Sequence, residues 1–306
     1  DDGGWGFSFE PIEGGFYDVG YVRTGAVAWA GWALASYGQA FDDDEALDAA
    51  RNVLTFIDAH KVHDDGISHS AEPHIGLYRA GTGHYDPRTG VRTLGVPVDF
   101  TVTEHQFDVH MLLDALDESR ADALAEQIQE TLWLDSEDRF AVGANPQGLD
   151  HRRALDAAGG WGALWLMSID KDDMARRSLS YTMENFATRD GTRAGGFVPY
   201  LDPLDGYDPA SRVVFVEGSL GVGLAALRLG QEEKAEEILR FAARLGCERG
   251  PGIPYADRRD EIFIPIPAAA STLWFLFLER EWTTGERAPA FRPLKNKQPS
   301  QTPEES

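Results

Sequence analysis

Apolar residues recur along this chain in two kinds of helical segment. Residues 24–39 are apolar on nearly every face, which is typical of a helix buried on all sides. In the following segment, Leu47 and Leu54 alternate at helical spacing with charged residues, which indicates an amphipathic helix on the outside. The link between the two, residues 40–44, is short. The pattern therefore predicts an antiparallel hairpin of one inner and one outer helix.

The same hairpin recurs three more times. Each copy joins an apolar helix to an amphipathic one by a tight link, and the expected pairs are 104–116 with 121–134, 155–169 with 172–186, and 217–229 with 232–245. A last apolar helix, 268–282, has no clear partner. The last four apolar helices begin about 50 to 60 residues apart, a spacing that suits repeated structural units. Long segments rich in Gly, Pro and aromatic residues separate the copies, the longest of them being the loop 61–102.

Inner helices surrounded by outer helices form a two-layer ring, so we expect an all-α (α/α) toroid of antiparallel helical hairpins. An open solenoid is the alternative, and it is disfavoured because its inner helices usually keep one polar face. If all inner helices run in one direction, every long loop and every inner N-terminus gathers at one mouth. We expect a single domain over residues 1–282, and a disordered tail over the polar, Pro-rich residues 283–306.

The charge balance excludes some classes of partner. The chain has 51 Asp and Glu against 28 Lys and Arg, so neither nucleic acid nor an anionic membrane surface suits it. Only 5 residues are Lys while 29 are Asp, as in proteins from salt-rich habitats, although an ordinary acidic protein explains this equally well. No apolar run approaches the roughly 18 residues that a membrane-spanning helix needs.

The sequence leaves the compartment and the oligomeric state open. Cys247 is the only cysteine, which excludes an internal disulfide and a multi-cysteine zinc site within one chain. The chain begins Asp-Asp-Gly-Gly, with neither an initiator Met nor a signal peptide, so we expect a trimmed N-terminus.

Three acidic residues stand at the start of apolar helices. Glu104 in TEHQFD, Asp156 in ALDAAGG and Glu217 in VEGSLG each follow a long loop, and Thr103 is expected to cap the first of these helices. In a toroid these helix starts share one mouth, so the three carboxylates are expected to face a common cavity. Asp108, one turn beyond Glu104, is expected to tune or position them. The alternative is that the acids only cap helices and complement the helix dipole.

Neither a metal nor a cofactor is expected. His105 and His110 lie five residues apart, whereas two histidine ligands on one helix face need a spacing of four. The acids of LDPLDGYDPA do not have the spacing of an EF-hand loop, so we favour an ordinary turn over a calcium site there. The sequence also has no phosphate-binding glycine loop and no nucleophilic-serine elbow.

The order of several short motifs resembles that of the six-hairpin glycosidase-like superfamily. These motifs extend over about residues 20–282, and they are YVRTGAVAWAGWAL, TEHQFDVHMLLDAL, LDAAGGWGALWLM, GGFVPYLDPLDGY, VEGSLGVGLAALRLG and GIPYADRRDEIF. The resemblance implies an (α/α) toroid with a carbohydrate-active cleft at the loop-bearing mouth, worked by acidic residues. A full ring of this superfamily has six hairpins, whereas nine helices are expected here. The ring is therefore incomplete or truncated, or it contains helices that the pattern does not reveal.

The candidate carboxylates suit the chemistry of glycoside hydrolysis. This reaction needs one carboxyl group that donates a proton and one carboxylate that activates water or attacks. A helix N-terminus favours the ionised form, so the acid needs burial or a neighbouring carboxylate, such as Asp108 beside Glu104, to raise its pKa. We therefore expect a glycoside hydrolase that cleaves an oligo- or polysaccharide, with Glu104, Asp156 and Glu217 as the candidate acid and base.

Further residues near the mouth are candidates for substrate binding. Trp161, Tyr200 and Tyr255 offer flat rings with polar tips, which suit sugar faces and hydroxyl groups. Arg23 is a candidate to contact a uronate or sulfate, although a structural ion pair suits it better. Together with Tyr255 and Arg23, His105 keeps open a sugar lyase or epimerase as the alternative enzyme. A toroid that binds a glycan or protein without chemistry is another alternative, and an isoprenoid-cyclase-like toroid is disfavoured because no Asp-rich diphosphate motif stands at a helix end.

Overall fold

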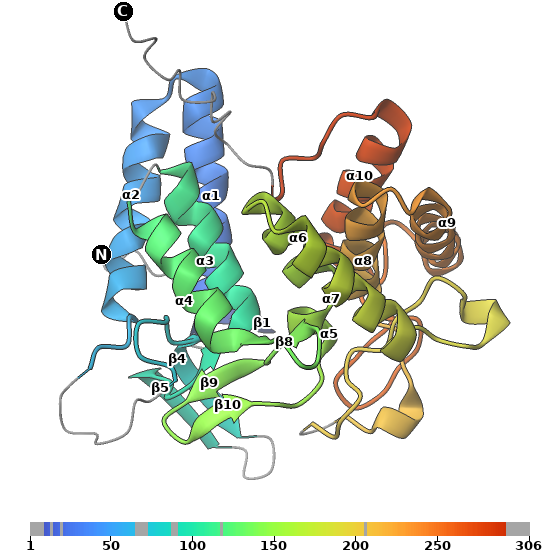
Figure 1. Ribbon diagram of the computed structural model, residues 1–306, viewed down its shortest axis with the longest axis horizontal. Coiled ribbons are helices and arrows are strands. Elements are labelled where there is room, and N and C mark those ends of the chain that lie inside the picture. The colour runs from blue at the N-terminus through green and yellow to red at the C-terminus, as the bar shows by residue number, and fades with distance from the viewer. Residues whose placement is uncertain are drawn as a thin grey trace, which may run out of the picture.

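The helices of the computed structural model alternate between an inner and an outer layer (Figure 1). The structure describes residues 9–12, 15–18, 21–64, 73–86, 91–116, 119–204 and 207–291. The inner helices are α1 (Thr24–Phe41), α3 (Thr103–Ala115), α5 (Leu155–Ala158) with α6 (Gly160–Ser168), α8 (Val216–Arg228) and α10 (Ala269–Thr284). The outer helices are α2 (Asp44–Ala59), α4 (Arg120–Leu132), α7 (Asp172–Asn185) and α9 (Glu232–Arg249).

Packing between helices follows the order of a ring. Helix α1 packs against α3, α3 against α6, α6 against α8 and α8 against α10, while each outer helix packs on the inner helix that precedes it. Burial differs between the layers as their sequences require: α8 buries ten of its thirteen residues, whereas α2 buries five of its sixteen on a single face. The fold is therefore an all-α toroid of antiparallel hairpins, as predicted.

Helices α1 and α10 meet where the ring closes. The ring centroid of Trp29 in α1 lies 6.1 Å from that of Trp274 in α10 and 6.2 Å from that of Phe291. Within the described chain α10 has no outer helix of the kind that covers the other inner helices, and Leu273 and Leu276 on it are about half exposed. The described part of the toroid thus ends on an inner helix.

The expected disordered tail is packed over its first part. Helix α10 continues to Thr284, and Ala288, Ala290 and Phe291 beyond it are buried. The guanidinium of Arg228 donates to the carbonyl groups of these same three residues. The ordered chain therefore extends past residue 282, and the rest of the expected tail, 292–306, lies outside the described residues.

Short strands lie in the loops at one end of the helices. They are β1 (Phe9–Ile12), β2 (Gly15–Asp18), β3 (Val22–Arg23), β4 (Gly81–Asp86), β5 (Val91–Pro97), β6 (Thr101–Val102), β7 (Trp133–Leu134), β8 (Arg139–Phe140), β9 (Gly143–Asn145) and β10 (Gly148–Asp150). All pairings between them are antiparallel; β4 pairs with both β3 and β5, and β9 with both β6 and β10. The long loop 61–102 thus contains a β-hairpin.

A repeated backbone hydrogen bond joins these loops to the helices. The N–H group of the first residue of an inner helix donates to a carbonyl group in the loop that precedes the next inner helix. The pairs are Thr24 to Ala80 at 3.0 Å, Thr103 to Val142 at 2.9 Å, Leu155 to Pro199 at 2.8 Å and Val216 to Tyr255 at 3.1 Å. Because the bond recurs at the same helix position, it places the starts of successive inner helices at one level.

Two details of the predicted helices are wrong. The expected continuous helix over 155–169 is interrupted at Gly159, whose ψ of −146° is not helical. The next residue, Gly160, contacts the backbone of α8, and a Cβ on it would lie 2.0 Å from the carbonyl carbon of Gly221. Thr103 is not a helix cap: Val102 occupies that position, and the Thr103 hydroxyl donates to the Ala141 carbonyl at 2.6 Å.

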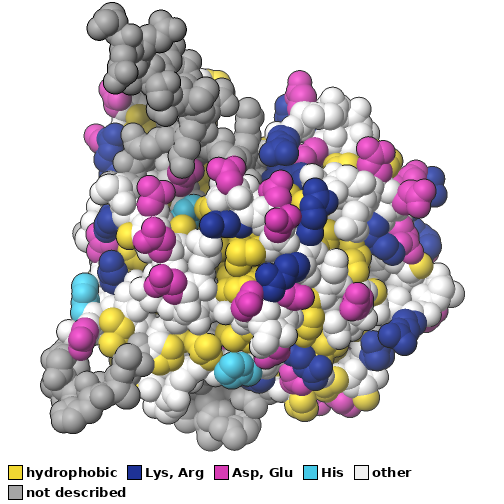
Figure 2. Space-filling model, viewed as in Figure 1, with side chains coloured by type: hydrophobic (Ala, Val, Ile, Leu, Met, Phe, Trp, Pro, Cys, Tyr) yellow, Lys and Arg dark blue, Asp and Glu magenta, His cyan; other side chains and the backbone are white. Residues whose placement is uncertain are grey.

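Charged side chains of both signs are interspersed over the face of the molecule drawn in Figure 2. Acidic groups predominate in the sequence as a whole, with a net charge of −23. Across the described residues, every helix is too short or too polar to cross a membrane.

Candidate active site

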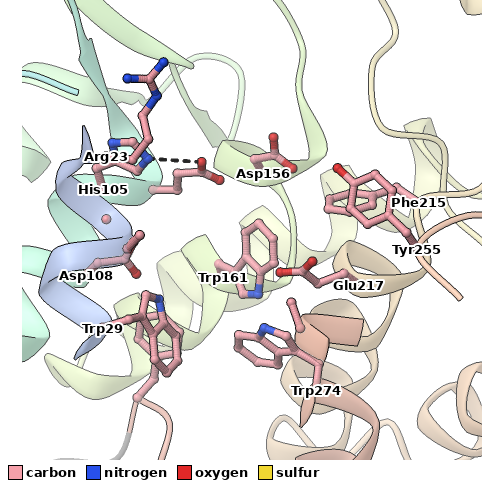
Figure 3. A pocket seen from close by; sticks show the side chains of 15 residues that line it. Arg23, Trp29, His105, Asp108, Asp156, Trp161, Phe215, Glu217, Tyr255 and Trp274 are labelled. Atoms are coloured by element: carbon pink, nitrogen blue, oxygen red, sulfur yellow. Dashed lines mark ion pairs between the residues drawn. The ribbon is translucent and has the colours of Figure 1, made fainter. Parts of the chain in front are cut away.

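The second residue of every inner helix lines one cavity, which has a volume of about 370 Å³. We call it the first cavity. These five positions are Gly25, Glu104, Asp156, Glu217 and Ala270. Three of them carry carboxylates and two carry no more than a methyl group. Because the repeated backbone hydrogen bonds set the helix starts at one level, the three carboxylates line the same space from neighbouring helices. Figure 3 shows two of them, Asp156 and Glu217.

The next turn of the inner helices provides an aromatic floor. Trp29 and Trp274 stand four residues after the second position of α1 and α10, and Asp108 stands four after that of α3. Trp161 stands five residues after Asp156 instead of four. The helix break at Gly159 displaces by one residue the position whose side chain lines the cavity. The indole of Trp274 lies 5.7 Å from Trp161 and 6.1 Å from Trp29, measured between ring centroids. Such indole surfaces suit the C–H face of a sugar ring.

Glu104 is the carboxyl group of the cluster whose pKa is raised by three neighbouring carboxylates. Burial raises its pKa well above the ordinary value, and the neighbouring carboxylates of Asp156, Asp108 and Glu217 raise it further. A charged Glu104 would place a negative charge in a buried space that already holds three other carboxyl groups. At neutral pH this group is therefore suited to donate a proton.

Asp156 and Glu217 titrate nearer to neutral pH. Burial raises the pKa of Asp156 to about 7, while a hydrogen bond from Tyr200 opposes this rise. Burial and the charge of Asp156 raise the pKa of Glu217 to about 7. The two groups interact, so their titration belongs to the cluster and not to either residue alone. The cavity thus holds proton donors and proton acceptors together near pH 7.

Asp108 is more buried than the other three carboxyl groups, with 8% of its surface exposed. Burial raises its pKa well above the ordinary value, a hydrogen bond from Trp29 lowers it, and the charge of Glu217 raises it. A Cβ on Gly25 would lie 2.7 Å from Asp108 Oδ2, so α1 can approach this carboxyl group only with glycine at that position.

His105 and Arg23 line the same cavity. The Nε2 atom of His105 lies 3.7 Å from Glu104 Oε1 (Figure 3). Burial and the charge of Arg23 lower the pKa of His105 to about 4, so the imidazole is uncharged at neutral pH. The guanidinium of Arg23 donates to the carbonyl groups of Thr82 and Gly83 in β4, at 2.9 and 3.0 Å. It is held mainly by backbone oxygen atoms.

The two predicted tyrosines line different cavities, although both rings contact Phe263. Tyr255 lines the first cavity and stacks on Phe263, with 5.3 Å between ring centroids and 11° between ring planes. Tyr200 lines a second cavity of about 290 Å³ instead, which Asp156 also lines. Burial raises the pKa of both phenols, which therefore stay protonated at neutral pH. All nine predicted site residues thus lie at these two adjoining cavities.

Buried polar atoms of the first cavity lack partners within the described protein. Asp156 Oδ1, Trp161 Nε1 and His105 Nδ1 are buried and make no hydrogen bond to another described residue. Such groups are costly to leave unpaired.

Several lining residues were not predicted from the sequence. Trp29 and Trp274 were expected only as parts of buried helices, although their position four residues after Gly25 and Ala270 provided a signal. Phe291 lay in the expected tail, where its sequence gave no signal. Among the described residues, no group of three or more His, Cys, Asp or Glu side chains has an arrangement that would hold a metal ion.

Comparison with known proteins relates the chain to solved structures. No protein-family model matches the sequence, and no curated protein matches it either. An α-amylase from Clostridium perfringens matches with a TM-score of 0.56 and 11% identity, over 92% of this chain and 77% of that one. A cellobiose 2-epimerase from Bacillus thermoamylovorans matches with a TM-score of 0.55 and 12% identity, over 88% and 74%. An α-mannanase from Bacteroides thetaiotaomicron matches with a TM-score of 0.51 and 11% identity, over 85% and 69%.

At these identities the similarity establishes the fold alone. The chain has the (α/α) toroid fold of the six-hairpin glycosidase-like proteins, in agreement with the resemblance of its motifs.

Proposed function

We propose that this protein is a carbohydrate-active enzyme that hydrolyses a glycosidic bond of an oligo- or polysaccharide. The observation that carries the proposal is the shared position of Glu104, Asp156 and Glu217, each the second residue of an inner helix facing one cavity. The tryptophan floor below them supports a sugar as the bound molecule. The names of the matching structures, which include an amylase, a mannanase and an epimerase, agree with this class of substrate.

In this proposal Glu104 donates the proton. Its raised pKa keeps it protonated at neutral pH, and the proton passes to the glycosidic oxygen as the bond from that oxygen to the anomeric carbon breaks. Asp156 and Glu217 are the carboxylates available to take a proton from the attacking water or to attack the anomeric carbon themselves. The hydrogen bond from Tyr200 favours the ionised form of Asp156. The reaction needs no cofactor.

The electrostatics of the first cavity favour a neutral sugar. Four carboxyl groups line it, while the imidazole of His105 is uncharged and the guanidinium of Arg23 is engaged by backbone carbonyl groups. An anionic sugar would enter a space where negative charge is already unfavourable. These features argue against the uronate or sulfate that Arg23 was considered to contact.

Sugar epimerisation is the second candidate, since two of the matching structures carry the names of sugar epimerases. That reaction needs a base that removes a proton from carbon. His105 is the histidine of the first cavity, and its pKa of about 4 makes it a weak base at neutral pH. The carboxylate cluster therefore favours hydrolysis.

A screen of neutral saccharides for release of reducing sugar, with product identification, tests the proposal. We expect Glu104→Gln and Glu217→Gln each to lower the rate by about 100-fold or more, as general acid–base groups do. Glu45→Gln, which changes an exposed acid in the first turn of the outer helix α2, is the matched control and should leave the rate unchanged. Unchanged hydrolysis in both cavity variants would reject the proposal, and an epimer as the sole product would favour the second candidate.

A further inference from the structure

The second cavity adjoins the first at two carboxyl groups. Glu104 and Asp156 line both cavities, whereas Glu217, Asp108 and the tryptophans line only the first. The rest of the wall of the second cavity comes mainly from four loop segments, which contribute Phe100 and Val102, Val142, Arg152 to Ala154, and Tyr200 with Asp202 to Leu204. A molecule that extended from one cavity into the other would therefore contact the side chains of both Glu104 and Asp156.

The charges on the wall of the second cavity are compensated by ion pairs. Arg153 donates from Nε and Nη2 to Asp202, at 3.0 and 2.6 Å, and its backbone N–H donates to the same carboxylate at 2.7 Å. Arg152 forms an ion pair with Asp150 at 2.5 Å. The remaining wall is largely apolar and aromatic, apart from the two shared carboxyl groups. This lining suits a neutral sugar better than an anionic one.

Aromatic side chains form the floor of the first cavity. Trp29, Trp161 and Trp274 form its floor, and Phe291 packs against Trp29 and Trp274 beside them. Its volume of about 370 Å³ lies at the small end of the usual range for ligand sites, which is roughly 300 to 1,000 Å³. One sugar ring would fill such a space, and the second cavity, which shares Glu104 and Asp156 with the first, offers room for the next ring of a longer saccharide.

We propose that the second cavity binds the leaving-group sugar, so that the enzyme removes single residues from the end of a neutral di- or oligosaccharide. The terminal sugar occupies the first cavity and the glycosidic oxygen lies between Glu104 and Asp156. Glu104 then stands beside the leaving oxygen, where the acid must be. This inference rests on the proposed hydrolase function and adds to it the mode of cleavage and a site for the leaving sugar.

Variants that fill the second cavity test this inference. Val142→Trp and Leu204→Trp each place a bulky ring there, away from the first cavity. Val96→Trp, at an exposed position of β5, is the matched control. For each protein we would measure kcat/KM for neutral disaccharides and for the matching glycosyl fluorides, whose leaving group needs no sugar site. The ratio of the two should fall by about tenfold or more in both cavity variants and stay constant in the control.

An unchanged ratio in the two cavity variants would overturn the inference while leaving the hydrolase function standing. If the wild-type protein cleaves no saccharide, the proposed hydrolase function is rejected. The second cavity is then tested by calorimetry, which measures the binding of saccharides to the Glu104→Gln variant. The inference predicts that cellobiose, maltose, lactose or mannobiose binds more tightly than its monosaccharide, and that Val142→Trp abolishes the difference. Equal affinities for all disaccharides and monosaccharides would overturn it.

Discussion

Glu104, Asp156 and Glu217 occupy a position in which two electrostatic effects oppose each other. The N-terminus of a helix stabilises a negative charge by about 0.3 to 1 kcal/mol at an exposed site, which lowers a carboxyl pKa. Burial and mutual repulsion act in the opposite direction, and they prevail, because the pKa of each of the three groups is raised. The cluster therefore keeps protons at neutral pH despite the helix dipoles, which is what a general acid requires.

The same burial makes the cluster unfavourable for folding at high pH, and Asp108 provides a test. Its pKa is raised in the folded protein, so the folded state binds the proton more tightly than the unfolded chain. The stability that protonated Asp108 contributes is fully present below the ordinary carboxyl pKa of about 4. It is lost as the pH rises through the pKa of Asp108 in the folded protein. Asp108→Asn cannot ionise and can still accept the hydrogen bond from Trp29. We expect it to raise the Tm relative to wild type at pH 8 and to change it far less at pH 4.

Thermal unfolding at the two pH values checks this expectation. Asp48→Asn, at an exposed position of α2, is the control and should give a similar small shift at both. A stabilisation by Asp108→Asn that is equal at both pH values, or larger at pH 4, would contradict the account.

The candidate catalytic carboxylates could be predicted from the sequence, whereas the tryptophan floor of the first cavity could not. An acid after a long loop and before an apolar run is a local pattern, which one sequence reveals. Trp29 and Trp274 belong to helices that are apolar on most faces, so the sequence does not distinguish the face directed at the cavity. Trp161 points inward only because of the break at Gly159, which depends on the contact of Gly160 with α8.

At the scale of elements, the hairpins followed from periodicity, whereas the loop structure did not. The inner and outer helices differ in the width of their apolar faces, and the spacing of apolar residues within each helical segment reveals this difference. The pairings of β3 with β4 and of β6 with β9, and the bonds from each inner helix to the next loop, join residues that are 39 or more positions apart. No local pattern reports such pairings.

A buried ion pair joins α8, α10 and the segment after α10. Arg228 and Glu281 have side-chain exposures of 2% and 7%, and Glu281 Oε2 also accepts the backbone N–H of Ala288. Removal of Glu281 leaves a buried guanidinium without its counter-charge, and breaking such a pair costs about 3 to 5 kcal/mol. We expect Glu281→Ala to lower the free energy of unfolding by this amount in a urea titration.

Arg280→Ala is the matched control on the same helix. Its ion pair with Glu286 is exposed, with side-chain exposures of 63% and 68%, so its loss should cost no more than about 1 kcal/mol. Similar losses of stability in the two variants would show that the buried pair does not fasten α10 to the toroid.

At the scale of the whole molecule, α1 and α10 close the described ring through aromatic side chains. Trp29, Trp274 and Phe291 pack together at this closure and also line the first cavity. The matches to solved structures cover 69 to 77% of the three chains described above, so those proteins contain further chain that has no counterpart in the alignment. The sequence predicted the toroid, but the closure depends on Phe291, which follows a Pro-containing polar segment that suggested disorder.

The central claim is that one sugar ring lies on the tryptophan floor with its glycosidic oxygen between Glu104 and Asp156. A crystal structure of the Glu104→Gln variant, soaked with a disaccharide that the wild-type enzyme cleaves, tests this claim most directly. We predict one ring over Trp161 and Trp274, the other in the second cavity, and the side chain of residue 104 within about 3.2 Å of the oxygen that links them. A saccharide bound outside both cavities, or one whose linking oxygen is out of reach of residue 104, would contradict the account.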